Sequence, residues 1–198
     1  MPSPVSFSKD RILDEAFNIL RKEGLQELSV RKIARNLGCS TQPVYSTFGS
    51  MQKLQDEALK KARKYAIDYL LQGNNSDEQS LAMGMQYFRF SREERVLFKI
   101  LFLEGEMAMT LETMSKFSAP LVERMKQDKF IKGLSEDRIK RIGRDMWVYT
   151  HGLVSFVYNV KKKDLEKSVL AQLLQMGETV IGWERYQAGL SRIKKNKK

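Results

Sequence analysis

Between residues 29 and 37, apolar positions recur with the period of an α-helix. One face carries the apolar residues Val30, Ile33, Ala34 and Leu37. Ser29 precedes them and can cap the helix with its hydroxyl group. Gly38 follows them, where a helix end favours a residue that tolerates a positive φ. The pattern therefore predicts a short amphipathic helix that ends in a turn.

A second short helix is predicted directly after this turn. Ser40 is its candidate N-cap, and Pro43 falls in the first turn, where its missing N–H breaks no helical hydrogen bond. Val44 and Phe48 lie four residues apart and form the inward face. The side chains left facing outward are Thr41, Gln42, Tyr45, Ser46 and Thr47. This arrangement is typical of a helix-turn-helix, whose second helix enters the major groove of DNA.

The rest of the chain also has helical periodicity. A first helix is predicted to begin after Ser8 and to end before Gly24, and Ser91 with Glu94 fits a capping box. Residues 73–77 form the clearest break, because Gly and Asn cluster there. Further helices are predicted over residues 50–71, 76–89, 91–104, 110–126, 135–158 and 163–188, followed by a solvated basic tail over residues 192–198. No sustained alternation indicates a strand, so we predict an all-α fold.

Three motifs resemble the tetracycline-repressor (TetR/AcrR) family of bacterial transcription regulators. They are SVRKIA at residues 29–34, LGCS at 37–40 and VYSTF at 44–48. The resemblance implies a helix-turn-helix DNA-binding domain over residues 1–49 and a helical effector-binding and dimerisation domain over residues 50–198. One position departs from the family pattern: members usually carry Lys directly after a loop Ser or Asn, whereas here Met51 follows the loop serine and Lys53 comes two residues later.

Several side chains of the predicted head suit DNA recognition. Gln42 can form two hydrogen bonds with adenine, and Thr41 or Ser46 can reach base acceptors or a thymine methyl group. The resemblance assigns the hydroxyl of Tyr45 to a phosphate, and a core aromatic is the alternative. Further predicted DNA-binding residues are Ser29, Arg31, Ser40, Pro43, Thr47 and Lys53. For Arg31 and its neighbour Lys32, an ordinary solvated helix surface is equally consistent with the sequence.

The charge balance favours a polyanionic partner. Lys and Arg number 35 against 24 Asp and Glu, which gives a formal net charge of +11. A basic surface that only maintains solubility is the alternative, and the helix-turn-helix decides between them. The single cysteine, Cys39, excludes an internal disulfide. Because no apolar run approaches the roughly 20 residues of a membrane span, and no signal peptide is evident, we expect a cytoplasmic protein without a membrane partner.

The last two long helices carry more apolar surface than one buried face requires. The predicted dimerisation residues are Phe156, Val169, Leu173, Met176, Val180 and Trp183. Two such helices from each subunit would form the four-helix bundle that the family resemblance implies. The alternative is that these side chains all pack within one chain.

Methionine and aromatic residues are frequent in the middle of the chain. The predicted ligand-binding residues are Phe88, Phe98, Phe102, Met107, Met114, Phe117, Trp147 and His151. Methionine adapts to irregular shapes and aromatic rings supply broad apolar walls, which suits a pocket for a small hydrophobic or aromatic effector. Plain core packing explains much of the same composition. His151 in particular is consistent with a hydrogen-bonded core group as well as with an effector contact.

Enzymatic and metal-dependent functions find little support in the sequence. One histidine and one cysteine, far apart in the chain, supply neither a metal cluster nor a Cys–His pair, and no phosphate-binding glycine-rich motif is present. We therefore predict a non-enzymatic, homodimeric regulator without a cofactor, most simply a ligand-released repressor that binds a palindromic operator. The alternatives are a non-specific protein that coats nucleic acid by charge, and a ligand-binding helical dimer whose DNA head is inactive.

Overall fold

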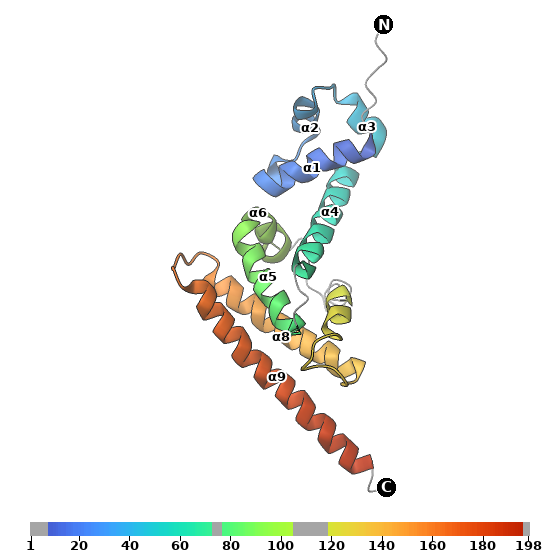
Figure 1. Ribbon diagram of the computed structural model, residues 1–198. Helices are drawn as coiled ribbons and strands as arrows, with labels where there is room; N and C mark the ends of the chain where they lie inside the picture. Colours follow the sequence, from blue (N-terminus) through green and yellow to red (C-terminus); the bar gives the residue numbers. More distant parts are fainter. Residues whose placement is uncertain (1–7, 73–76, 105–118, 196–198) are drawn as a thin grey trace. The chain divides into compact units, whose positions relative to one another are not determined.

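Every regular element that the computed structural model describes is a helix (Figure 1), which confirms the predicted all-α fold. The described residues are 8–72, 77–104 and 119–195. They form two compact units, residues 8–66 with 94–104, and residues 67–72 and 77–93 with 119–195. The boundary between the units falls within α4 (Met51–Leu71) and therefore does not coincide with the predicted boundary between residues 49 and 50.

The first two helices begin and end as their sequences predict. Ser8 caps α1 (Lys9–Glu23) by accepting a hydrogen bond from the backbone N–H of Arg11 at 3.2 Å. A 3₁₀ turn, η1 (Leu25–Glu27), leads to α2 (Val30–Leu37), where Ser29 accepts from the N–H of Lys32 at 3.3 Å. Gly38 ends α2 in the left-handed conformation, with a φ of 69° that a side chain would disfavour.

The third helix, α3 (Gln42–Phe48), begins one residue later than predicted. Thr41 is its N-cap, and no side chain forms the capping hydrogen bond, so the expected cap at Ser40 is wrong. The reason is local: Thr41 already has helical dihedral angles, and Pro43 supplies a first turn that lacks an N–H to be capped. Gly49, with a φ of 76°, ends the helix.

Side chains from α1, α2, α3 and α4 form the core of the first unit. The most deeply buried are Ile12, Ala16, Leu20, Ile33, Val44, Leu54, Ala58 and Ala62. The short α6 (Arg95–Phe98) and the π-helical turn η2 (Lys99–Leu103) complete this core, and they bury Leu97, Phe98, Ile100, Leu101 and Phe102. Burying one Leu, Ile or Phe side chain contributes roughly 1.5–3 kcal/mol.

The helix break predicted near residue 90 lies further along the chain. α5 (Gln79–Glu93) runs through Ser91, whose hydroxyl is buried and donates to the carbonyl of Phe88 at 2.6 Å, so the predicted capping box at Ser91 is wrong. The break occurs at Glu94, which is 7% exposed. Its carboxylate accepts hydrogen bonds from Arg21 and from the hydroxyl of Tyr65, the latter at 2.8 Å. These contacts hold Glu94 to α1 and α4 within the first unit.

The second unit packs α5, the helical residues 119–125, α8 (Glu136–Val157) and α9 (Leu165–Lys195) around a second core. Its most buried apolar residues are Phe90, Ile131, Ile139, Ile142, Val154, Val169 and Leu173. Ser135 is the N-cap of α8, as predicted, although its side chain makes no capping bond. α9 continues to Lys195, so the basic segment expected to be a tail is partly helical. No described helix is long and apolar enough to cross a membrane.

A buried carboxylate joins α8 to α9. Glu184 on α9 is 7% exposed, and it accepts hydrogen bonds from Arg138 at 2.6 Å and from Arg141 at 2.8 Å. The bonds from Arg141 and Arg138 hold the pKa of this carboxyl below its usual value. A carboxyl with a depressed folded pKa stabilises the fold above its unfolded pKa, and the contribution disappears as pH falls through the folded pKa.

We therefore expect Glu184→Gln to lower the free energy of unfolding by about 1–3 kcal/mol near neutral pH, because the two guanidinium groups lose an ionised acceptor. As the pH falls through the depressed folded pKa, the wild-type carboxyl itself takes up a proton, so the difference between the two proteins should shrink. Chemical denaturation near neutral pH and at the lowest pH at which both proteins still fold measures this difference. Glu166→Gln is the control, because Glu166 forms an exposed pair with Arg89, which contributes at most about 1 kcal/mol. An equal loss at both pH values would contradict this role of Glu184.

Candidate functional site

The outer face of α3 is polar and exposed. Gln42 and Ser46 are exposed, and Tyr45 is 50% exposed, so the alternative of a core aromatic at Tyr45 is wrong. Val44 and Phe48 are 1% and 7% exposed and form the inward face. Because a seven-residue helix has only two turns, burial of these two side chains is sufficient to direct its remaining side chains outward.

Two hydroxyl groups on α3 bond within the helix. Ser46 and Thr47 both donate to the carbonyl of Pro43, at 3.1 Å and 2.7 Å. In this state each hydroxyl oxygen keeps lone pairs that can accept from a base amino group. To donate to a phosphate, either hydroxyl must first rotate away from this carbonyl. The side-chain amide of Gln42 forms no such hydrogen bond with any described residue, so it is available to pair with a base edge.

The structure distinguishes the two basic residues that the sequence left equivalent. The ammonium group of Lys32 is bound by Glu23 and by Glu27, the latter at 2.9 Å, and the hydrogen bond to Glu23 is the main cause of its raised pKa. Arg31 is exposed, and among the described residues no carboxylate pairs with it. Of these two residues, Arg31 is therefore the one whose charge is available to a phosphate.

The other predicted DNA contacts also belong to the first unit. Ser29 and Ser40 are exposed, and Thr41 and Pro43 are half-buried at the start of α3. Lys53 is exposed in the first turn of α4, where its N–H donates to the hydroxyl of Ser50 at 3.2 Å. Placement in one unit is compatible with a common DNA-facing surface.

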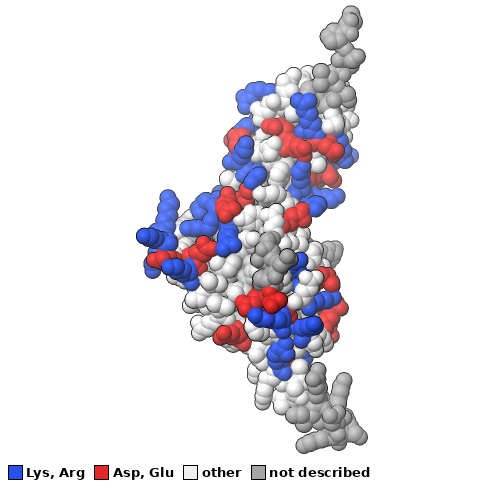
Figure 2. Space-filling view, viewed as in Figure 1, with Lys and Arg blue, Asp and Glu red and all other residues white. Residues whose placement is uncertain are grey.

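Basic side chains do not form one continuous patch on the face shown in Figure 2. Lys and Arg side chains are interspersed there with Asp and Glu. A protein that coats nucleic acid by charge alone is favoured by a contiguous basic surface, because its affinity comes from neutralised phosphates. The face shown in Figure 2 does not present such a surface.

Comparison with known protein families finds a match for the part of the chain that contains α3. Residues 12–58 match the family model described as bacterial regulatory proteins, tetR family. This segment of the chain is similar to the tetR family. The match covers most of α1, all of α2 and α3 and the start of α4, which is the part of the chain that carries the helix-turn-helix. Comparison with curated proteins finds no match.

Solved structures of tetR-family regulators share the fold over most of the chain. A tetR-family transcriptional regulator from Streptomyces coelicolor has a TM-score of 0.62 at 16% identity, covering 90% of this chain and 86% of its own. A variant of TetR from Acinetobacter baumannii AYE, in complex with minocycline, has a TM-score of 0.56 at 16% identity, covering 91% and 98%. ActR from S. coelicolor, in complex with (S)-DNPA, has a TM-score of 0.50 at 18% identity, covering 96% of each chain. At these identities the likeness shows the fold of a tetR-family transcriptional regulator.

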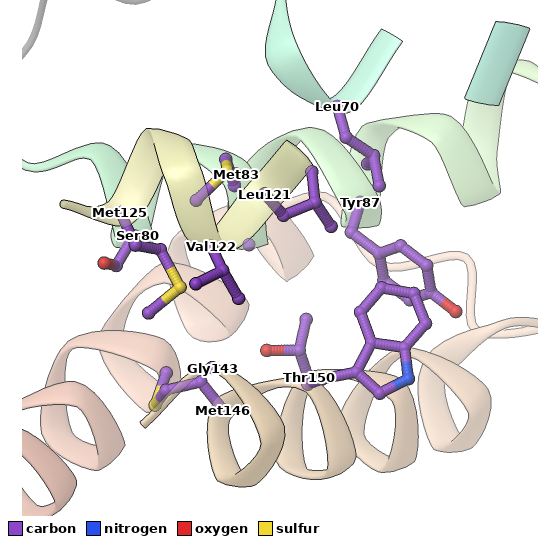
Figure 3. Close-up of a pocket in the computed structure, with 12 residues that line it drawn as sticks. Leu70, Ser80, Met83, Tyr87, Leu121, Val122, Met125, Gly143, Met146 and Thr150 are labelled. Carbon is purple, nitrogen blue, oxygen red and sulfur yellow. The ribbon is translucent and has the colours of Figure 1, made fainter. Parts of the chain in front are cut away.

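The second unit contains a small apolar cavity. Its volume is about 70 Å³, and it lies among α5, α8, residues 121–125 and the end of α4. In Figure 3 the labelled side chains of Met83, Tyr87, Val122 and Thr150 surround this space. Its remaining lining residues are Leu70, Ser80, Gly84, Leu121, Met125, Gly143, Met146 and Trp147. None of the lining residues carries a formal charge at neutral pH, so the cavity suits an uncharged group.

The predicted ligand-binding residues separate into three groups. Trp147 lines the cavity, whereas Phe88 is buried in the same unit without lining it. Phe98 and Phe102 are buried in the first unit, whereas Trp147 belongs to the second, and a pocket shared by the three residues stays a prediction. The predictions at Met107, Met114 and Phe117 lie outside the described residues.

Sequence reasoning missed most of the cavity wall. Met83 and Tyr87 are four residues apart on α5, and Gly143, Met146 and Thr150 recur at helical spacing on α8. The available signal for this wall was the helical spacing of these residues, combined with large side chains on α5 and small ones, such as Gly143, on α8. The pattern alone does not say which two helices face each other.

His151 lies behind the cavity wall. Its Nδ1 is 2.8 Å from the hydroxyl of Tyr87, and its ring is nearly parallel to that of Trp147, at an interplanar angle of 7°. Burial lowers the pKa of His151 and raises the pKa of Tyr87 well above its usual value. The phenol therefore keeps its proton and donates a hydrogen bond to Nδ1 of the neutral imidazole when the ring carries its own proton on Nε2. The described residues contain no cluster of His, Cys, Asp and Glu that could hold a metal ion.

The predicted dimerisation residues also divide by exposure. Phe156 and Trp183 are 88% and 59% exposed, whereas Val169 and Leu173 are each 1% exposed. Val169 and Leu173 pack inside the second unit, so they are not available to a partner and their assignment to a subunit contact is wrong. Met176 and Val180 are half-buried. Other exposed apolar residues on α8 and α9 are Val148, Leu174, Tyr186 and Leu190.

Because the chain has one histidine, the Tyr87 contact can be tested by NMR. We expect His151 to titrate below about 6.5, the usual value for histidine. Tyr87→Phe should raise the pKa of His151, since it removes the hydroxyl that stabilises the neutral ring. Tyr149→Phe is the matched control, because the hydroxyl of Tyr149 donates to Gln172. If Tyr87→Phe leaves the pKa of His151 unchanged or lowers it, the proposed hydrogen bond does not govern this group.

Proposed function

We propose that the chain is a sequence-specific transcriptional regulator that binds a near-palindromic operator as a homodimer and is released by a small apolar effector. The observation that carries this proposal is the outward polar face of α3, held by the buried Val44 and Phe48. In this arrangement Gln42 reads a base edge, while Tyr45 and Arg31 bind phosphates. Repression, rather than activation, is the simplest form of regulation for such a protein.

A dimer is needed because one short helix reads only a few base pairs. Two copies read two half-sites separated by about one helical turn of DNA or a multiple of it. The exposed apolar residues of α8 and α9 support such a dimer, since a monomeric protein rarely exposes this many large apolar side chains on two neighbouring helices. Phe156 is the most exposed of them and is the strongest candidate for the centre of the contact.

The effector is proposed to enter the second unit. Two structures with this fold were solved with small molecules, minocycline and (S)-DNPA, and that fact supports an effector here. The cavity of about 70 Å³ is well below the roughly 300–1,000 Å³ of typical small-molecule sites, so binding requires its walls to separate. Leu70 at the end of α4 is one of these walls, and α4 continues into the first unit. A ligand that moves this wall can thereby change the orientation of the DNA head, to the extent that it binds the two states with different affinity.

Selection from a random duplex pool tests the specific function directly. The expected product is a near-palindrome that the protein binds at least about 1,000-fold more tightly than a scrambled duplex at the same salt concentration. Equal affinity for both duplexes would instead support the charge-coating alternative. Failure to bind any duplex would support a ligand-binding dimer with an inactive head.

Tyr45→Phe tests the proposed phosphate contact. Loss of one hydrogen bond to a charged phosphate should weaken binding of the selected operator by about tenfold or more. The reduction should be similar for operator variants with altered bases, because a phosphate contact carries no sequence information. Tyr149→Phe is the control, since Tyr149 lies on α8 in the other unit and its hydroxyl donates to Gln172. Fluorescence anisotropy at fixed salt gives both affinities, and an unchanged affinity in Tyr45→Phe excludes it as an anchor.

Phe156→Asp tests the proposed dimer surface. A charge at the centre of an apolar contact should raise the dimer dissociation constant by roughly 30-fold or more. Phe130→Asp is the control, because Phe130 is 49% exposed but lies outside α8 and α9. Sedimentation equilibrium measures the dissociation constant, and circular dichroism checks that both variants fold. A dimer of undiminished stability in Phe156→Asp would place the subunit contact elsewhere.

A further inference from the structure

A surface groove adjoins the cavity of the second unit. Its volume is about 380 Å³, and it runs between the start of α5, residues 128–130 and α9. Ser80 and Met146 line both the groove and the cavity, so they form a shared wall. The groove, unlike the cavity, is large enough for a small molecule. The two spaces together offer a deep apolar end and an open outer end.

The shared wall is suited to opening. Met146 has an unbranched, flexible side chain that can change rotamer without displacing the backbone. The hydroxyl of Ser80 is buried, and none of the described residues provides it with a hydrogen-bond partner. A buried hydroxyl without a partner is unfavourable, and a ligand atom or a water at this point would satisfy it. Ser80 is therefore a polar contact point at the passage between the two spaces.

The two ends differ in charge. The cavity lining contains no formally charged side chain, whereas the groove is lined by Glu78, Asp128, Glu178 and Arg185. Apolar walls are supplied to the groove by Leu81, Phe130, Leu174 and Ile181. Three carboxylates against one guanidinium make the groove acidic, although the chain as a whole carries a net charge of +11.

The partners of these groups show which charge is available. Glu78 pairs with Lys129 at 3.0 Å, and Asp128 accepts from two backbone N–H groups, at 2.9 Å each. Arg185 donates to two backbone carbonyls, the nearer at 2.7 Å. Glu178 is exposed, and in the described part of the chain it forms no ion pair. Lys129 offsets Glu78, and the guanidinium group of Arg185 offsets one further carboxylate, so the groove keeps one net negative charge. Glu178 is the exposed carboxylate among its lining residues.

From this geometry we propose that groove and cavity form one site for an amphipathic cation. The apolar body of the ligand passes Met146 into the cavity, and its cationic group stays in the groove beside Glu178. This inference rests on the proposed function only in identifying the ligand with the effector. Binding itself involves no DNA, so it is tested separately from operator recognition.

Calorimetric titration of the full-length protein with octyltrimethylammonium, octyl sulfate and 1-octanol tests the charge preference. The three probes share one apolar chain and are used at low salt, below micelle-forming concentrations. We expect the cation to bind about tenfold more tightly than the sulfate, with octanol between them. Equal affinities, tighter binding of the sulfate, or no binding of the cation would overturn the proposal.

A matched pair of variants tests whether Glu178 causes the preference for the cation. Glu178→Gln should reduce the cation-to-anion affinity ratio by about threefold or more, whereas Glu166→Gln should leave it unchanged. The second variant makes the same charge change on the same helix, at a residue paired with Arg89 outside the groove. An equal effect of the two variants would mean that the preference reflects overall charge, and this too would overturn the site.

A cavity-filling variant tests entry of the apolar body. A Cβ at Gly143 would meet the flexible side chain of Met125, with its sulfur 3.3 Å away, so Gly143→Val fills the cavity at little backbone cost. The gain in affinity from butyltrimethylammonium to octyltrimethylammonium should then fall by about threefold or more. Gly143→Ala serves as a milder second variant if the valine variant unfolds. An unchanged dependence on chain length in a folded variant would show that the ligand stays outside the cavity.

Discussion

The presentation of α3 depends on the burial of two apolar side chains, Val44 and Phe48, in the first unit. A helix of seven residues is not stable in water by itself, because nucleation is unfavourable and few hydrogen bonds follow it. Packing on α1 and α2 therefore both forms the helix and sets its orientation. The same packing exposes Gln42 and Tyr45, so the proposed recognition of DNA and the stability of the first unit depend on one interaction.

Glu94 connects this head to the helix that precedes it in the chain. The carboxylate is buried and is held by Arg21 and Tyr65, while the residue before it ends α5. Loss of one partner from a buried ionic contact is unfavourable, so Glu94 is firmly held within the first unit. α5 also contributes four residues to the cavity wall. The chain therefore passes between the two units at Glu94 as well as within α4.

The cavity and the groove together indicate how chemical selectivity arises in the second unit. The inner walls are apolar, and the nearest titratable pair, Tyr87 and His151, is neutral because burial disfavours its charged forms. Charge is confined to the outer end, where Glu178 lies. A ligand with its charge at one end matches this division, whereas a ligand charged at its centre would have to place that charge in the apolar cavity.

Local sequence determined the helices and most of their ends. Ser8, Ser29 and Gly38 act within one turn of their own positions, so the sequence alone predicted their roles, and it predicted the polar outer face of α3 in the same way. The helical period also showed which faces are apolar. It did not show what each face contacts, because a buried core residue and a residue exposed for a partner have the same spacing.

Only the tertiary structure decided those contacts. Phe98 packs in the first unit and Leu173 in the core of the second, while Phe156 is left exposed, although all three are large apolar residues on predicted helices. The break at Glu94 likewise lies where its carboxylate accepts from Arg21, a residue far away in the sequence, and not at the local signal of Ser91. Helix formation follows from interactions within a few residues, whereas the core, the cavity and the groove form where distant segments meet.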